Sequence, residues 1–252
     1  MVTGTQELAL NLTDVSKLFG GLRAVDNVAL SVAPGERRAL IGPNGAGKTT
    51  LFNLISGDLP ASGGRIDLFG RDVTRLPPHR RAALGMARTY QITNLFPKLT
   101  VEENLLLAVQ ALERTKLMLF RPITSYRHLY LRAQATLDSV GLGDKAGEVV
   151  KNLSHGEQRQ MEIAMALAGR PRILLLDEPA AGLSPAESRM MTALLKTLDH
   201  KITLIVIEHD MDVAFALTDR VTVLHNGKVI ADGSRDEVKA DPLVREIYLG
   251  SA

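Results

Sequence analysis

Hydrophobic and polar residues along this chain follow two different periods, and the first part favours short strands. Leu8–Val15 and Ala24–Val32 alternate apolar with polar residues, and a further short strand is expected at Arg65–Phe69. Between them, Lys48–Ile55 has helical spacing that places its large apolar residues on one face. The first part of the chain therefore predicts strands around one helix.

The pattern becomes helical between Pro97 and about Leu167. Val101–Leu112 carries one apolar stripe, and Tyr126–Val140 predicts a second helix. The segment Lys116–Pro122, between these two helices, has no clear period. We expect a helical subdomain here, inserted into an α/β core.

Strands and helices alternate again in the last part of the chain. Short apolar runs followed by helical patterns are typical of parallel strands buried on both faces. The expected elements are strand Ile173–Leu176, helix Pro185–Leu198, strand Thr203–Ile207, helix Met211–Leu217, strand Val221–His225, turn Asn226-Gly227 and strand Lys228–Ala231. The pattern predicts one α/β domain over residues 1–252. Residues 1–92 and 168–252 would form the core with a β subdomain, and residues 93–167 the helical subdomain.

The composition and charge of the chain limit the kinds of molecule that it is expected to bind. The chain is 45% hydrophobic and 23% charged, which allows a sizeable core, and its formal net charge of +2 does not predict a basic nucleic-acid-binding face. It has no cysteine, which excludes a disulfide framework. Met1–Asn11 has no signal-peptide pattern, and the apolar runs are far shorter than the roughly 20 residues of a membrane helix. We therefore expect any action at a membrane to depend on other subunits.

The strongest chemical signal is a glycine-rich loop between a predicted strand and a predicted helix. Its sequence, Gly42-Pro43-Asn44-Gly45-Ala46-Gly47-Lys48-Thr49, matches the P-loop pattern G-x-x-x-x-G-K-[ST] and is followed by Thr50. Backbone N–H groups of such a loop, and the start of the helix after it, surround phosphates. Lys48 is expected to reach the β- and γ-phosphates, and Thr49 to bind Mg²⁺. The loop predicts a core of the RecA-like, P-loop NTPase class, which binds a nucleoside triphosphate.

A second signal follows the strand Ile173–Leu176, which ends in Asp177-Glu178-Pro179, a Walker B arrangement. Buried carboxylates at a strand end are unfavourable unless they meet a cation. Asp177 is expected to hold Mg²⁺, and Glu178 to activate the attacking water as general base. A strand ending in two acids can equally be a solvated strand end, but its position behind a P-loop favours the catalytic interpretation.

The segment Leu153-Ser154-His155-Gly156-Glu157-Gln158 opens a predicted helix just before that strand. Its start can serve as an anion site, and serine followed three residues later by glutamate is also a helix-capping box. The segment resembles the signature of ABC ATPases, usually Leu-Ser-Gly-Gly-Gln. His155 replaces a glycine of that motif, Glu157 replaces its glutamine, and Ser154 and Gly156 are retained.

The resemblance implies roles for three single residues. Taken alone, each of them would be only weak evidence of function. Gln91 corresponds to the Q-loop residue that contacts Mg²⁺, His209 to the switch histidine, and Phe19 to the aromatic residue that stacks on adenine. Ser184 stands in the D-loop, where ABC ATPases usually carry aspartate, and could alter signalling between two ATP sites. The other histidines have no metal-ligand spacing: His79, His128, His155, His200 and His225.

The chain is similar in particular to ATPases of the branched-chain, or hydrophobic, amino-acid importers, over about residues 7–250. The matching stretches are Asp177–Pro185, Ile207–Val213 and Val244–Gly250. The resemblance implies ATP and Mg²⁺ as ligands, and a homodimer or a heterodimer with a sister ATPase. Each ATP would lie between one P-loop and the signature of the other chain. It also implies two transmembrane permease subunits, an indirect solute-binding partner, and a peripheral location on the cytoplasmic face of the inner (plasma) membrane.

Three alternatives remain open on the sequence. The ATPase type that extracts lipopolysaccharide shares the Tyr-Leu-Gly ending, but it generally keeps the D-loop aspartate that Ser184 replaces. An ABC protein of translation or DNA repair would normally carry two cassettes or a long coiled-coil insert. A regulatory protein that binds ATP without hydrolysis would not need Glu178 and His209. The transported solute is open, because amino acids, urea, amides and small aromatic acids all have importers of this kind.

Overall fold

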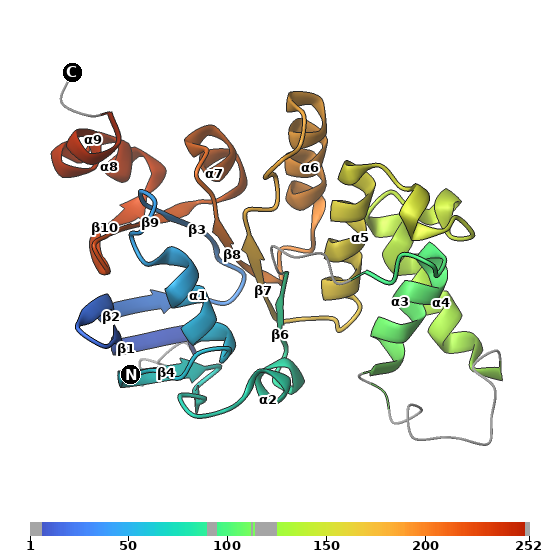
Figure 1. Ribbon diagram of the computed structural model, residues 1–252, viewed down its shortest axis with the longest axis horizontal. Helices are drawn as coiled ribbons and strands as arrows, with labels where there is room; N and C mark the ends of the chain where they lie inside the picture. Colours follow the sequence, from blue (N-terminus) through green and yellow to red (C-terminus); the bar gives the residue numbers. More distant parts are fainter. Residues whose placement is uncertain (1–6, 90–94, 112, 114–124, 250–252) are drawn as a thin grey trace, which may run out of the picture. The chain divides into compact units, whose positions relative to one another are not determined.

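A computed structural model describes residues 7–89, 95–111, 113 and 125–249. The chain forms two compact units (Figure 1). Unit 1 comprises Met1–Met86, Arg172–Glu178 and Asp199–Ala252, and unit 2 comprises Ala87–Pro171 and Pro179–Leu198. Unit 2 includes the predicted helical subdomain and also the segment Pro179–Leu198, which the sequence placed in the core.

Unit 1 contains a small antiparallel sheet with the strand order β2-β1-β4-β5. Its strands are β1 (Leu10–Phe19), β2 (Leu22–Val32), β4 (Gly63–Leu68) and β5 (Arg71–Asp72). The β1–β2 hairpin is longer than predicted at its turn, because Phe19 pairs with Leu22 across Gly20-Gly21. Alternation is lost in this stretch, so the sequence pattern stopped at Val15 and resumed at Ala24.

The larger sheet has the strand order β10-β9-β3-β8-β7-β6. Its strands are β3 (Arg37–Ile41), β6 (Met86–Arg88), β7 (Ile173–Asp177), β8 (Thr203–Ile207), β9 (Arg220–His225) and β10 (Lys228–Ser234). β3 pairs in parallel with β8 and β9, β7 pairs in parallel with β8, and β10 is antiparallel to β9. Every residue of β3, β7 and β8 is buried, which accounts for the continuous apolar runs of β7 and β8.

The helices of unit 1 are α1 (Lys48–Ser56), α2 (Pro78–Ala83), α7 (Met211–Leu217), α8 (Arg235–Ala240) and α9 (Pro242–Leu249). α1 buries the apolar face predicted for it, with Leu51, Leu54 and Ile55 fully inaccessible. α8 and α9 were not predicted, although each carries a start signal. Ser234 and Glu237 form a capping box before α8, and Pro242 opens α9 at the position where proline is favoured.

Unit 2 is helical over the part that the structure describes. It contains α3 (Val101–Ala111), α4 (Arg127–Ser139), α5 (His155–Leu167), α6 (Pro185–Thr197) and the short 3₁₀ helices Gly143–Lys145 and Val150–Asn152. α3, α4 and α5 pack on one another. The fully buried side chains between them are Val101, Leu105, Val109, Leu129, Ala133, Leu137, Met161 and Ala164.

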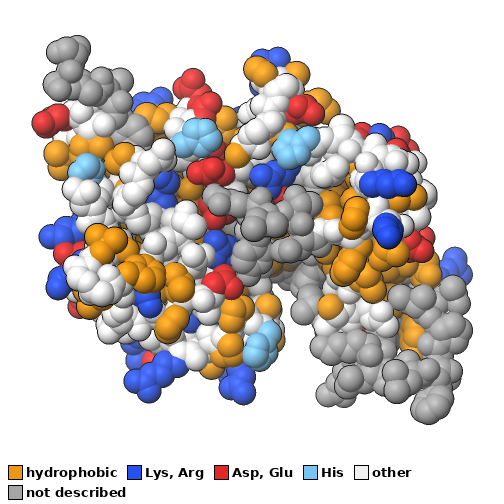
Figure 2. Space-filling view, in the orientation of Figure 1, with side chains coloured by type: hydrophobic (Ala, Val, Ile, Leu, Met, Phe, Trp, Pro, Cys, Tyr) orange, Lys and Arg blue, Asp and Glu red, His pale blue; other side chains and the backbone are white. Residues whose placement is uncertain are grey.

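Among the described residues, no helix combines the length and the apolar character that crossing a membrane requires. Some large apolar side chains remain at the surface of unit 1. Leu18, Phe19 and Leu22, at the end of the β1–β2 hairpin, are 44%, 46% and 67% exposed. Hydrophobic side chains gather on this side of unit 1 (Figure 2).

Candidate functional site

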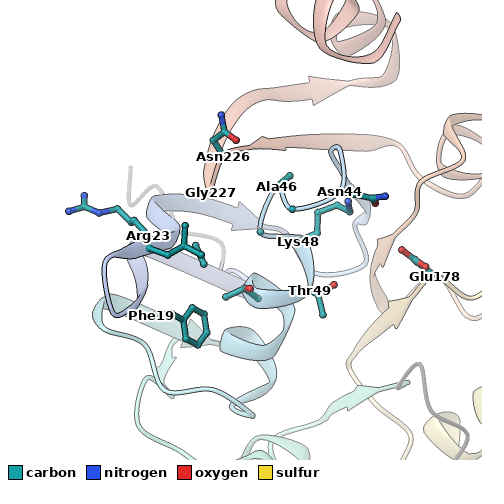
Figure 3. A pocket seen from close by; sticks show the side chains of 14 residues that line it. Phe19, Arg23, Asn44, Ala46, Lys48, Thr49, Glu178, Asn226 and Gly227 are labelled. Atoms are coloured by element: carbon teal, nitrogen blue, oxygen red, sulfur yellow. The ribbon is translucent and has the colours of Figure 1, made fainter. Parts of the chain in front are cut away.

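The glycine-rich loop connects the end of β3 to the start of α1 (Figure 3). Gly47 stands at the N-cap of α1 with φ of 102°, a conformation that favours glycine. Its carbonyl accepts the first helical hydrogen bond from the Leu51 N–H at 2.8 Å. Lys48 and Thr49 are therefore the first residues of the helix, where unpaired N–H groups favour an anion.

The loop is held by the backbone of β2 and of the turn between β9 and β10, both in unit 1. A Cβ on Gly47 would lie 2.5 Å from the Ala24 carbonyl oxygen of β2. The Gly227 N–H, in the β9–β10 turn, donates to the Ala46 carbonyl at 2.9 Å. Gly45 has open space around its Cβ position but φ of 81°, so it is needed for conformation and not for room. These contacts fix the backbone of the loop at Ala46 and Gly47.

Lys48 is the cation of the loop and is only 7% exposed. Its Nζ donates to the carbonyl oxygens of Gly42 at 2.6 Å and Pro43 at 3.1 Å. Burial lowers the pKa of Lys48 from its ordinary value, while the negative charges of Glu178 and Asp177 act in the opposite direction. The ammonium group is thus held in the loop and faces two acids.

Those two acids stand at the carboxyl end of β7. Asp177 is 2% exposed and pairs with Ile207 of β8. Glu178 follows with φ of 49°, a left-handed conformation that is unfavourable for a glutamate, and its N–H donates to the Ile207 carbonyl at 3.0 Å. This turn of the backbone places Glu178 on the wall of the cavity that Lys48 and Thr49 also line.

The cavity has a volume of about 650 Å³, within the range of small-molecule sites. Phe19 lies at one side of it and Glu178 at the other, with Lys48 and Thr49 between them (Figure 3). Its full lining is Phe19, Leu22, Arg23, Ala24, Asn44, Gly45, Ala46, Gly47, Lys48, Thr49, Thr50, Glu178, Asn226 and Gly227. An apolar ring, a cation, hydroxyls and a carboxylate follow one another along it, which matches the parts of a nucleoside triphosphate with a divalent cation.

The sequence analysis missed five residues of this lining: Leu22, Arg23, Ala24, Asn226 and Gly227. Leu22 was obscured because the hairpin extends beyond the alternating pattern. Asn226 and Gly227 were predicted only as a turn; their place beside the P-loop depends on the pairing of β9 with β3, far apart in sequence.

Among the described residues predicted to bind nucleotide or Mg²⁺ or to act in catalysis, four do not line the cavity. Gly42 and Pro43 begin the loop, and their carbonyl oxygens accept hydrogen bonds from Lys48. Asp177 is buried directly before Glu178, and His209 is exposed just beyond the end of β8. Because β7 and β8 are parallel neighbours, their carboxyl ends lie at one edge of the sheet. Gln91 is outside the described residues.

The predicted signature residues start α5 in unit 2. Ser154 is the N-cap; its Oγ accepts the Glu157 N–H, and its own N–H donates to Glu157 Oε2 at 2.8 Å. Lys145 forms an ion pair with the same carboxylate. These contacts hold the pKa of Glu157 below its ordinary value, the Lys145 hydrogen bond being the largest cause. Glu157 thus caps the helix in place of the usual glutamine.

The predicted D-loop residue Ser184 starts α6 with a second capping box. Its Oγ accepts the Glu187 N–H, and its backbone N–H and hydroxyl both donate to Glu187 Oε2, at 2.9 and 2.7 Å. The Glu187 carboxylate also lies close to the first turn of α5, since a Cβ on Gly156 would be 3.0 Å from Oε1. The sequence analysis did not single out Glu187, although Ser184 and Glu187 have the spacing of a capping box.

Two family profiles match the sequence. The profile described as ABC transporter matches residues 25–181, and the profile described as branched-chain amino acid ATP-binding cassette transporter matches residues 228–252. The chain is 39% identical to the high-affinity branched-chain amino acid transport ATP-binding protein BraF of Pseudomonas aeruginosa, covering 96% of this chain and 98% of BraF. It is 40% identical to the corresponding protein LivG of Escherichia coli K12, with the same coverage of 96% and 98%.

Solved structures of ATP-binding cassettes are similar to this chain over nearly its whole length. The ADP conformation of an ATP-binding cassette of an ABC transporter superposes with a TM-score of 0.84 at 31% identity, covering 97% of this chain and 99% of that one. A dimeric cassette in a post-hydrolysis state, bound to ADP and phosphate, gives a TM-score of 0.76 at 28% identity, covering 90% and 98%. The predicted fold class is thereby confirmed. The chain belongs to the ATP-binding cassettes of the ABC transporter family.

Proposed function

We propose that this chain hydrolyses ATP to energise uptake of branched-chain or other hydrophobic amino acids, or of related small solutes. The observation that carries the ATPase role is the single cavity that joins the P-loop, Phe19 and Glu178. The match of residues 228–252 to the branched-chain transporter profile supports the cargo class. It also favours the importer over the lipopolysaccharide-extraction alternative.

At the triphosphate, backbone N–H groups of the P-loop and of the first turn of α1 donate hydrogen bonds to the β- and γ-phosphates. Lys48 exchanges its two carbonyl partners, Gly42 and Pro43, for phosphate oxygens, which are charged acceptors and bind an ammonium more strongly than carbonyl oxygens do. Phe19 offers its exposed ring to the adenine. A bound Mg²⁺ would neutralise developing charge on the phosphates.

The cation site that we propose combines the Thr49 hydroxyl, the Asp177 carboxylate and Gln91. Hydroxyl, carboxylate and amide oxygens are the ligand types that Mg²⁺ prefers. Glu178 accepts a proton from the attacking water, and its backbone conformation aims it at the cavity instead of along the strand. His209, which follows the end of the neighbouring strand β8, assists Glu178 in activating the attacking water.

The working form that we propose is a dimer of ATPases, either of identical chains or with a sister subunit. Ser154, His155, Gly156 and Glu157 of one chain face the triphosphate held by the other, and Ser184 stands at the junction of the two sites. The related cassette that is dimeric with ADP and phosphate supports this arrangement. The dimer acts on two transmembrane permease subunits at the cytoplasmic face of the plasma membrane, and indirectly on a solute-binding protein.

The experiment that tests this function is ATP hydrolysis by the chain with and without its permease and solute-binding protein in lipid vesicles. We expect leucine-loaded binding protein to raise the hydrolysis rate and to drive leucine uptake. The Lys48→Ala variant serves as the control and should lose both. ATP binding without hydrolysis in the complete assembly would contradict the proposal and favour a regulatory nucleotide binder.

A further inference from the structure

A lysine of β1 lies over the aromatic ring at one side of the cavity. The Lys17 ammonium stands over the Phe19 ring, with Nζ 5.1 Å from the ring centroid. The Phe19 ring is 46% exposed and lines the cavity (Figure 3). Lys17 is not among the described residues that line the cavity. The lysine therefore contacts the ring from outside the cavity and leaves its cavity side open to a ligand.

The segment before β4 holds this lysine in place. Lys17 Nζ donates to the Pro60 carbonyl oxygen at 2.8 Å. A lysine side chain is long and has many rotamers, so this hydrogen bond restricts where the ammonium lies. An ammonium has three donors, and one of them is engaged here. The cation is thus anchored on Pro60 beside the ring.

The same segment holds the backbone of β1 on both sides of Lys17. The Ser62 N–H donates to the Ser16 carbonyl oxygen at 2.8 Å, and the Leu18 N–H donates to Ser62 Oγ at 3.0 Å. β4 begins only at Gly63, so a side-chain oxygen here takes the place of a strand carbonyl. These hydrogen bonds fix β1 directly before Phe19.

Residues 57–62 also join this strand to the helix that carries Lys48. The Gly57 and Leu59 N–H groups both donate to the Asn53 carbonyl oxygen of α1, at 3.1 and 3.0 Å. The contacts of Pro60 and Ser62 then continue from the end of α1 to β1. The position of the Phe19 strand is therefore tied to that of the P-loop helix.

We propose that Lys17 is a positioning residue for the base of a purine nucleoside triphosphate. Anchored on Pro60, it occupies the outer side of Phe19 and keeps the ring in the orientation that stacks on the base. A cation over an aromatic ring is attracted by the π electrons, and this attraction opposes rotation of the ring. The proposal rests on the role of Phe19 given under the proposed function.

A long-range attraction between the Lys17 charge and the phosphates is the competing explanation. Such an attraction depends on the charge of the ligand and not on its base. Positioning of Phe19 acts only on a ligand that has a base to stack. A comparison of ATP with tripolyphosphate, which has the phosphates but no base, therefore separates the two explanations.

The test measures the Kd of ATP and of tripolyphosphate, each with Mg²⁺, by calorimetry on the full chain in a Glu178→Gln background. In Lys17→Met we expect the Kd of ATP to rise about twofold to fivefold, the loss of one cation–π contact at the surface, and that of tripolyphosphate to stay unchanged. Lys17→Arg should retain ATP affinity, because a guanidinium also binds an aromatic face and can donate to Pro60.

Lys239→Met is the matched control. Lys239 Nζ lies 4.4 Å from the centroid of the Phe215 ring, and neither residue is among the described residues of the cavity lining. Its replacement removes the same kind of contact and should change neither Kd. Equal rises for ATP and tripolyphosphate in Lys17→Met would overturn the proposal, since they would indicate long-range charge or a damaged P-loop.

Phe19→Ala in the same background separates this proposal from the role of Phe19 itself. Loss of stacking should raise the Kd of ATP at least about fivefold and leave that of tripolyphosphate unchanged. If Phe19→Ala weakens ATP binding but Lys17→Met does not, the role of Phe19 stands and that of Lys17 is overturned. If neither variant weakens it, stacking on Phe19 fails and the positioning by Lys17 falls with it.

Discussion

Replacing Arg81 with methionine is expected to loosen the helix that carries Lys48. The Arg81 side chain is 2% exposed and donates to the carbonyl oxygens of Leu54 and Ile55, both at 2.7 Å, in the last turn of α1. It also donates to Leu76 at 2.9 Å and Thr74 at 3.2 Å. A single guanidinium thus donates both to the C-terminal end of the P-loop helix and to the segment between β5 and α2.

The size of the effect follows from those acceptors. Methionine leaves the two buried carbonyls of α1 without this donor, at about 1–3 kcal/mol each. Loss of a cation near the helix C-terminus adds about 0.3–1 kcal/mol. Burial of the guanidinium, which lowers its pKa, offsets part of this sum. We expect Arg81→Met to cost about 3–5 kcal/mol, a large part of the roughly 5–15 kcal/mol that stabilises a typical domain.

Urea unfolding followed by circular dichroism measures this loss as a shift of the midpoint at constant slope. Arg80→Met is the matched control, since Arg80 is exposed in the same helix and its replacement should change stability by less than about 0.5 kcal/mol. Arg81→Lys should fall between the two, because an ammonium lacks the planar fork of donors. Equal midpoints for Arg81→Met and Arg80→Met would refute the reasoning.

Three further outcomes follow from the same contacts. Gly47→Ala should destabilise the chain by about 1–3 kcal/mol and weaken ATP binding in calorimetry, since a Cβ there would lie 2.5 Å from a backbone oxygen of β2. Ser154→Ala and Ser234→Ala should each cost about 1 kcal/mol in unfolding experiments as lost helix caps, but only Ser154→Ala should slow ATP hydrolysis. Because the pKa of Glu157 is below its ordinary 4.5, its contribution to stability is present above that pH and is lost as the pH falls through the depressed value. The difference in unfolding midpoint between Glu157→Gln and the unchanged chain should therefore shrink below about pH 4.5.

The sequence predicted the parts of this fold in which local pattern and tertiary environment agree. β7 and β8 were predicted because both are buried along their whole length, and α1 because its apolar face follows a clear period. The P-loop and the acids after β7 could be identified because phosphate and metal chemistry restrict the residue types at fixed spacing. The family assignment from these motifs was confirmed by the profile matches.

The parts of the fold and site that the sequence did not predict depend on contacts between segments that are distant in the chain. No local pattern places the Asn226-Gly227 turn against Ala46, because that contact follows from the pairing of β9 with β3. In the same way, the capping box of Ser184 and Glu187 is visible in the sequence, but the approach of the Glu187 carboxylate to Gly156 exists only once α5 and α6 are folded. α8 and α9 were missed because they are only six and eight residues long, although each carries a start signal.

The most direct test of ATP hydrolysis at this cavity is to measure ATP binding and turnover together in Glu178→Gln, in the assembled transporter. We predict that ATP affinity stays within about twofold of the unchanged chain, while turnover falls by about 10²–10⁴, the contribution of a general base. Turnover close to that of the unchanged chain, with ATP still bound, would contradict the assignment of Glu178 and with it the proposed mechanism.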